Sequence, residues 1–174
     1  NGPDLTVDET EVLLALGNFV GTKSDVDISD TAAALISAGD NVLDVDGVDV
    51  VSASDPSVNA NIGGVLAGFT ADVEFDVVDT ANAVVAEVAA SGFGPGGLDE
   101  ANNLTVSGGN VDTAEAADIQ SISGYDGSAS DYDITDTAEA LISAGDDVLD
   151  VDGVDTVSVI TGPVDADTGE ALAE

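Results

Sequence analysis

The chain repeats itself, and this repetition constrains its fold more than any other feature. Residues 25–49 read DVDISDTAAALISAGDNVLDVDGVD and residues 131–155 read DYDITDTAEALISAGDDVLDVDGVD, so 25 aligned positions differ at only four. A weaker copy begins at Asp72 and contains a Gly/Pro insertion at 92–97. Self-similarity at such a period is typical of architectures in which each unit buries its apolar surface against its neighbours.

Each copy contains a strand pattern followed by a helix pattern. In DVDISD, Val26 and Ile28 alternate with polar residues, which predicts a half-buried strand. Short strands are also predicted at 48–53, 103–108 and 154–160. Asp followed three residues later by Glu predicts a helix capping box, and this spacing occurs at Asp8/Glu11, Asp112/Glu115, Asp136/Glu139 and Asp167/Glu170. Asp30 and Asp79 occupy the same predicted cap position without the Glu, and Gly145 fits the end of a helix.

Strands and helices that alternate in turns of about 25 residues predict parallel strands joined by helical crossovers. We therefore expect an α/β repeat solenoid, with short parallel strands on one side and short helices on the other. Val, Ile, Leu and Ala would fill its thin core. A compact α/β globule is the alternative.

The repeats suggest one continuous array over residues 1–174. It would comprise an N-terminal half-unit (1–23), a first repeat (24–70), a degenerate second repeat with the insertion (71–129) and a third repeat (130–174). Both ends read as half-units without polar caps. We expect them to meet further repeats of a longer chain or neighbouring copies head to tail, with 1–20 of one copy against 154–174 of the next.

The charge of the chain is extreme: 36 acidic residues accompany one basic residue, Lys23, for a net charge of −35. Hydrophobic residues still make up 44% of the chain, which favours a folded protein over an acidic disordered tail. Cations from the medium must offset the charge, so we expect the melting temperature to rise with salt or calcium. Nucleic acid would be repelled, and the apolar runs are too short for membrane insertion.

The run DYDITDTAEALISAGDDVLDVDGVDTVSV, preceded by VDTAEAADIQSISGYDGSAS, resembles the acidic "DTA" tandem repeats of very large bacterial cell-surface and secreted proteins. The similarity is strongest over 110–160 and clear over 24–53. The resemblance implies a secreted or cell-surface, non-catalytic array in giant adhesins or surface-layer-like proteins, often in calcium-rich settings. It supplies no catalytic residues.

The motif DVDGVD occurs twice and is a candidate calcium site, since hard cations bind several oxygen ligands in Asp-rich turns. The candidate ligands are Asp44, Asp46, Asp49, Asp150, Asp152 and Asp155. The spacing does not match an EF-hand loop, because the first ligand position falls on Val42 and the twelfth on Ala53. The alternative is a plain turn between a helix and a strand.

The strand carboxylates Asp27, Asp76 and Asp133 are a second candidate, because stacking would place them at equivalent positions on one exposed sheet face. Cations would relieve their repulsion if the strands were neighbours. A solvated acidic face is the alternative.

The chain contains no His, Cys or Arg, so it lacks the usual general base, thiol nucleophile and cationic clamp of an active site. We therefore predict no enzymatic activity and expect an extracellular structural or adhesive module of a surface layer, filament or adhesin stalk. A calcium- or mineral-binding module is the second hypothesis, and a glycan-active enzyme is the third.

Overall fold

The computed structural model describes residues 4–16, 25–91 and 97–160, and in them the chain is a mixed α/β protein. Its strands are β1 (Asp4–Leu5), β2 (Val26–Asp30), β3 (Val48–Ala53), β4 (Val73–Glu74), β5 (Asp76–Asp79), β6 (Asn103–Val111), β7 (Asp131–Asp136) and β8 (Val154–Val159). Its α-helices are α1 (Val7–Ala15), α2 (Ala32–Ala38), α3 (Asp40–Leu43), α4 (Ala60–Ala67), α5 (Ala81–Ser91), α6 (Thr113–Ser121), α7 (Ala138–Ala144) and α8 (Asp146–Leu149). Two 3-10 turns, η2 (Leu98–Glu100) and η3 (Gly127–Ala129), complete the described elements.

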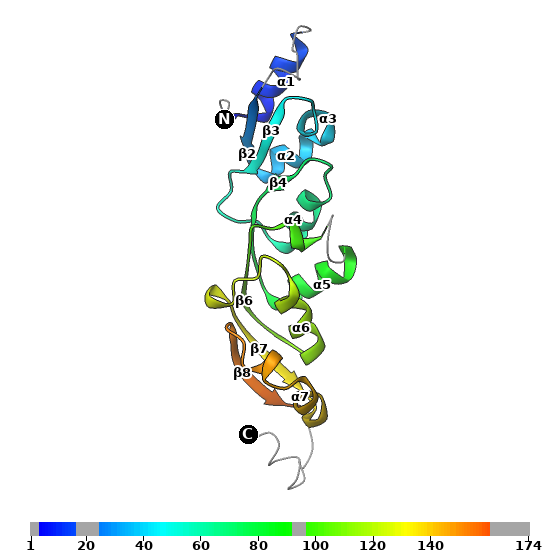
Figure 1. Cartoon of the computed structure of the whole chain (residues 1–174), viewed down its shortest axis with the longest axis vertical. Coiled ribbons are helices and arrows are strands. Elements are labelled where there is room, and N and C mark those ends of the chain that lie inside the picture. The colour runs from blue at the N-terminus through cyan, green and yellow to red at the C-terminus, as the bar shows by residue number, and fades with distance from the viewer. Residues whose placement is uncertain (1–3, 17–24, 92–96, 161–174) are drawn as a thin grey trace.

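The strands pair in parallel and in chain order. They form two four-stranded sheets, β1-β2-β3-β4 and β5-β6-β7-β8. A parallel bridge between Val58 and Val77 adds the segment after β3 to the edge of β5. Parallel neighbours need a crossover connection, and helices supply it. In Figure 1 the labelled strands lie along one side of an elongated molecule and α2 to α7 lie along the other.

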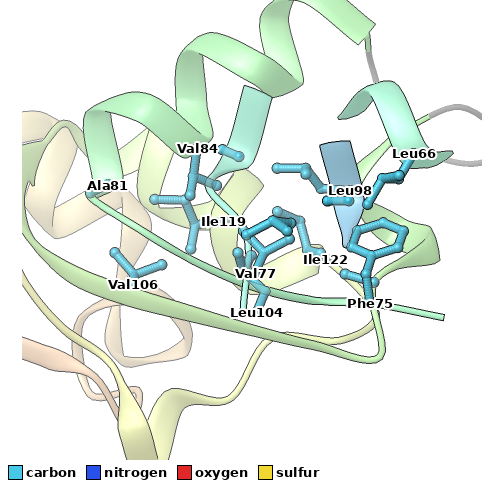
Figure 2. Packing of buried hydrophobic residues seen from close by; sticks show 14 of the residues in the cluster. Leu66, Phe75, Val77, Ala81, Val84, Leu98, Leu104, Val106, Ile119 and Ile122 are labelled. Atoms are coloured by element: carbon cyan, nitrogen blue, oxygen red, sulfur yellow. The ribbon is translucent and has the colours of Figure 1, made fainter. Parts of the chain in front are cut away.

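The core is a thin layer between strands and helices. Figure 2 shows Ala81 and Val84 of α5 gathered with Val77 of β5 and Leu104 of β6, and all four are fully buried. Alanines at the helix starts allow the helices to lie close to the strands. Val, Ile, Leu and Ala dominate the core as expected, and the buried aromatic residues Phe75 and Tyr132 add to it.

The predicted strands agree with the structure. The segment 48–53 is β3 (Val48–Ala53), while 103–108 and 154–160 correspond closely to β6 and β8. Gly145 ends α7 with a φ of 66°, and the short helix α8 starts directly after it. Of the Gly/Pro insertion at 92–97, residues 92–96 lie outside the described residues, as does the predicted Asp167/Glu170 pair.

The helix caps differ in part from those predicted from the sequence. Asp112 and Glu115 form the predicted capping box. At α1, however, the box consists of Thr6 and Glu9 and not of Asp8 and Glu11. Hydrogen bonds from the Thr6 backbone N–H and, to a smaller extent, from its hydroxyl lower the pKa of Glu9.

The caps predicted at Asp30 and Asp136 are also wrong, because Thr31 and Thr137 cap these helices. Asp79 likewise ends a strand, one residue before Thr80. Each of these aspartates still belongs to its strand, which leaves its carboxylate available for another task.

Candidate functional site

Four aspartates, each at the end of a strand or just after it, contact the start of a helix 19 or 23 residues earlier in the chain. In each, Oδ2 accepts a hydrogen bond from the backbone N–H of the first residue of that helix. We call them the aspartate clamps: Asp30 to Val7 (3.0 Å), Asp55 to Ala32 (2.6 Å), Asp79 to Ala60 (3.0 Å) and Asp136 to Thr113 (3.1 Å). The acceptor therefore lies at a helix N-terminus, where backbone N–H groups lack partners and negative charge is favourable.

The second oxygen of a clamp is also used. In Asp30, Asp79 and Asp136, Oδ1 accepts a hydrogen bond from the backbone N–H of the following threonine at 2.7, 2.8 and 2.7 Å. Asp136 also accepts a bond of 2.7 Å from the Thr113 hydroxyl. The hydrogen bonds from the Thr113 hydroxyl, the Thr113 N–H and the Thr137 N–H, in this order of size, lower the pKa of Asp136. At Asp30-Thr31 and Asp136-Thr137, the D-T of the DTA motif thus combines a clamp with a helix cap.

The start of α5 is held differently. Gly108 and Gly109 have φ values of 78° and 113° and form an irregularity in the pairing of β6 with β7. An added Cβ on Gly109 would lie 3.1 Å from the Ala81 Cβ. The Asn82 Nδ2 group instead donates a hydrogen bond of 3.2 Å to the Asn110 carbonyl. A close backbone approach here accompanies a link through the Asn82 amide.

A separate acidic cluster lies at the start of β2 and β3. One carboxylate oxygen from each of Asp25, Asp27 and Asp49 lies within 4.8 Å of the other two. Asp27 is only 7% exposed, and its Oδ1 is buried without a hydrogen-bond partner. Three such carboxylates repel one another unless a cation or protons intervene, so this group could hold a metal ion.

A β-bulge forms the cluster. Val26 pairs with Val48, whereas Asp27 pairs with Val50, so Asp49 is the extra residue on β3. A bulge re-aims the side chain of the extra residue. In this position the Asp49 carboxylate lies beside that of Asp27, although the two residues are not register partners.

Of the six ligands predicted from the DVDGVD motifs, the structure places only Asp49 in a group of three acidic residues among the residues it describes. Asp44 and Asp150 end the short helices α3 and α8. Asp46 lies in the turn before β3, and Asp155 is the bulge residue of β8. The ligand roles of these four residues stay predictions.

Asp152 contributes its backbone to a contact. Its carbonyl accepts a hydrogen bond of 2.8 Å from the Tyr125 hydroxyl. Burial raises the pKa of this tyrosine above its ordinary value of 10.0. This bond fixes the backbone of the turn, and the ligand role of Asp152 stays a prediction.

The second candidate set, Asp27, Asp76 and Asp133, does not lie on neighbouring strands, so the condition for their mutual repulsion is not met. These residues lie on β2, β5 and β7, which are not neighbours in either sheet. Asp76 instead accepts a hydrogen bond of 2.9 Å from the Asn103 amide. Sequence reasoning placed Asp27 on an exposed face and did not select Asp25 as a ligand. The signal available was the recurrence of D-x-D and D-G-V-D together in both copies.

Comparison with protein-family models, with curated proteins and with solved structures finds no match for this chain. None of the described helices has the length and apolar character required to cross a membrane.

Proposed function

We propose that the chain is a non-enzymatic structural or adhesive repeat module, folded as an α/β solenoid and belonging to an extracellular surface layer, filament or adhesin stalk. One observation carries the proposal: the strands pair in parallel in chain order, and the clamps tie helix starts to the following turn. Such a unit contacts mainly its neighbours, so it extends along one direction.

The strand order supports a solenoid over a compact α/β globule. Doubly wound globules reverse their strand order at a switch point, where a ligand crevice forms. Neither sheet of the described chain contains such a reversal. Three of the clamps join residues 23 apart in sequence, as expected for turns of similar length.

The charge supports an extracellular setting. Thirty-six carboxylates accompany a single lysine, so the compact state requires screening or bound cations from its surroundings. Calcium-rich or saline extracellular media supply both. The predicted partners are accordingly cations, further repeats of a longer chain, or copies of this chain.

Strand β8 is the place where the array would continue. Among the described strands it pairs with β7 alone, and Val157, Val159 and Ile160 are 42%, 39% and 54% exposed. A strand with an unpaired edge is a template for another strand. We propose that a further repeat, or a second copy of the chain, adds to this edge.

Light scattering in molar salt tests this assembly, with a matched pair of variants. The Ile160 N–H donates to the Asp136 carbonyl on β7, so by alternation the Val157 N–H points away from β7. Val157→Pro should remove an edge donor and reduce association, whereas Val157→Thr keeps the donor and should associate as the parent does. A parent chain that stays at 17.1 kDa at every concentration would contradict assembly between copies.

A second candidate function, a calcium- or mineral-binding module, is favoured by the acidic cluster. It is compatible with the first, because a bound cation can stabilise one turn of an array.

A further inference from the structure

We propose that Asp25, Asp27 and Asp49 bind one calcium ion where β2 and β3 begin. The proposal deepens the second candidate function and does not depend on array assembly. It names three carboxylates, of which only Asp49 belongs to a DVDGVD motif. Asp25 also makes a further interaction.

The main observation is the state of Asp27. The residue is only 7% exposed, yet its Oδ1 has no hydrogen-bond partner. Buried polar atoms in folded proteins nearly always have a partner, and a buried carboxylate needs one more than most. No arginine or histidine exists in the chain to supply it. A cation among the three carboxylates would complete the coordination of this oxygen.

The dimensions of the cluster suit a single ion. Calcium binds oxygen at about 2.3–2.6 Å, so two ligands of one ion lie at most about 4.6–5.2 Å apart. The three carboxylate oxygens already lie within 4.8 Å of one another. The bulge at Asp49 creates this spacing, since it brings a second strand carboxylate beside Asp27.

The surroundings make the cluster more negative still. The register partner of Asp27 on the other neighbouring strand is Asp4, which is exposed. Acidic residues therefore flank Asp27 from both β1 and β3. A divalent cation would offset this charge far better than sodium, because two charges act at one point.

The ligand type selects calcium among divalent cations. Carboxylate oxygens are hard ligands, and the chain has no cysteine or histidine to favour zinc or copper. Magnesium demands near-ideal octahedral geometry at about 2.0–2.1 Å and usually keeps most of its waters. Three protein carboxylates, one buried and two exposed, fit the larger and more tolerant calcium ion better.

The second copy provides an internal control. Asp131, Asp133 and Asp155 occupy the equivalent positions, and β8 carries the same bulge after Val154. In the described structure they do not form such a group, and Asp133 is half-buried. The same sequence pattern is therefore tested in two environments within one molecule.

The experiment is calcium titration of the full chain, followed by thermal melting and calorimetry in 0.5 M sodium chloride, about the level that screens diffuse binding. We expect one specific site with a dissociation constant of about 10⁻⁴–10⁻³ M, as in other extracellular calcium modules. Asp27→Asn should remove the calcium-dependent rise in melting temperature. Asp133→Asn, the matched control, should keep it.

The variants should also differ without calcium. Asp27→Asn removes a buried unpaired charge, so in chelator it should melt at the same temperature as the parent or higher. Asp49 is exposed, so Asp49→Asn should leave folding intact. It should weaken calcium binding at least tenfold. Magnesium at equal concentration should give a smaller shift.

Two results would overturn the proposal. One is an equal calcium-dependent shift in the parent, Asp27→Asn and Asp49→Asn chains. The other is loss of the shift to the same extent in Asp133→Asn, which would assign it to overall charge. Neither result depends on whether copies assemble, so failure of this site and failure of the array are distinguishable.

Discussion

Residues 25–49 and 131–155 are nearly identical in sequence, and they adopt the same secondary structure in different surroundings. Gly39 and Gly145 have φ values of 65° and 66°, and Gly47 and Gly153 have φ values of 98° and 100°. Gly39 and Gly145 each separate two short helices, and each copy contains a β-bulge at its second strand. Local sequence therefore determines the elements and their turns.

Burial differs between the copies where backbone conformation does not. Val51 on β3 is 2% exposed, whereas its counterpart Val157 on β8 is 42% exposed. Leu43 is fully buried and its counterpart Leu149 is half-buried. Strand β3 lies between β2 and β4, while β8 has a single described neighbour. The comparison shows that packing in this chain is set by the strands and helices next to each copy and not by the repeat itself.

The largest expected effect is a difference between equivalent leucines. Leu43→Ala should cost about 2–5 kcal/mol of unfolding free energy, the usual range for a buried leucine. Leu149→Ala should cost clearly less, because solvent already reaches that side chain. Chemical denaturation of both variants measures the two losses.

A second pair serves as the control. Leu35 and Leu141 are 0% and 1% exposed, so their alanine variants should lose similar amounts. Equal losses of unfolding free energy in Leu43→Ala and Leu149→Ala would contradict the idea that neighbouring strands and helices decide the packing.

The same distinction explains what could be predicted from the sequence. Strand β3 could be predicted to the residue, because alternation and turn residues are local signals. The caps of α2 and α7 could not, since Asp and Thr both favour the N-cap in D-T. The choice depends on whether the strand includes Asp30, whose carboxylate accepts a hydrogen bond from the Val7 N–H at the start of α1.

The acidic cluster could not be predicted from the sequence. Alternation places Asp27 on the face opposite Val26 and Ile28, but it does not tell how much of that face is covered. The bulge that brings Asp49 beside Asp27 depends on strand register. Pairing of segments far apart in sequence decided both, whereas the motif predicted only that acidic residues would lie near this turn.

The clamps allow a test on the second copy. Asp136→Ala should lower the melting temperature more than Asp131→Ala, because Asp136 accepts three hydrogen bonds from Thr113 and Thr137. Asp131 is exposed at the start of β7, and its removal relieves charge repulsion. Equal melting temperatures of the two variants would mean that the clamp does not stabilise the fold.

Acid should weaken the same clamp. The folded pKa of Asp136 lies below its ordinary value of 3.8. Its stabilisation is therefore complete above that value and is lost as the pH falls through the folded pKa. Protonation of the other carboxylates relieves repulsion, so the useful quantity is the difference between the parent and Asp136→Asn. That difference should shrink below about pH 4, and a constant difference across the acid range would exclude the clamp as its source.

The smallest expected effect concerns the one substitution between the copies that fills the core. Tyr132 replaces Val26, and its hydroxyl accepts a hydrogen bond of 2.8 Å from the Gln120 amide. The same amide nitrogen donates to the Val148 carbonyl at 3.0 Å. In the first copy, the residue equivalent to Gln120 is Leu14, which has no side-chain hydrogen-bond donor.

Tyr132 is therefore paired with Gln120 in the second copy, where the first copy has Val26 and Leu14. A double-mutant cycle measures the coupling between Tyr132 and Gln120. Tyr132→Phe should cost about 0.5–1.5 kcal/mol, and most of that cost should vanish in a Gln120→Leu background. Gln120→Leu alone should cost more, because the tyrosine hydroxyl would then be buried without its donor and the Val148 carbonyl would lose its bond. Additive losses would mean that the hydroxyl finds another partner, and the two copies would then differ only in side-chain volume at this position.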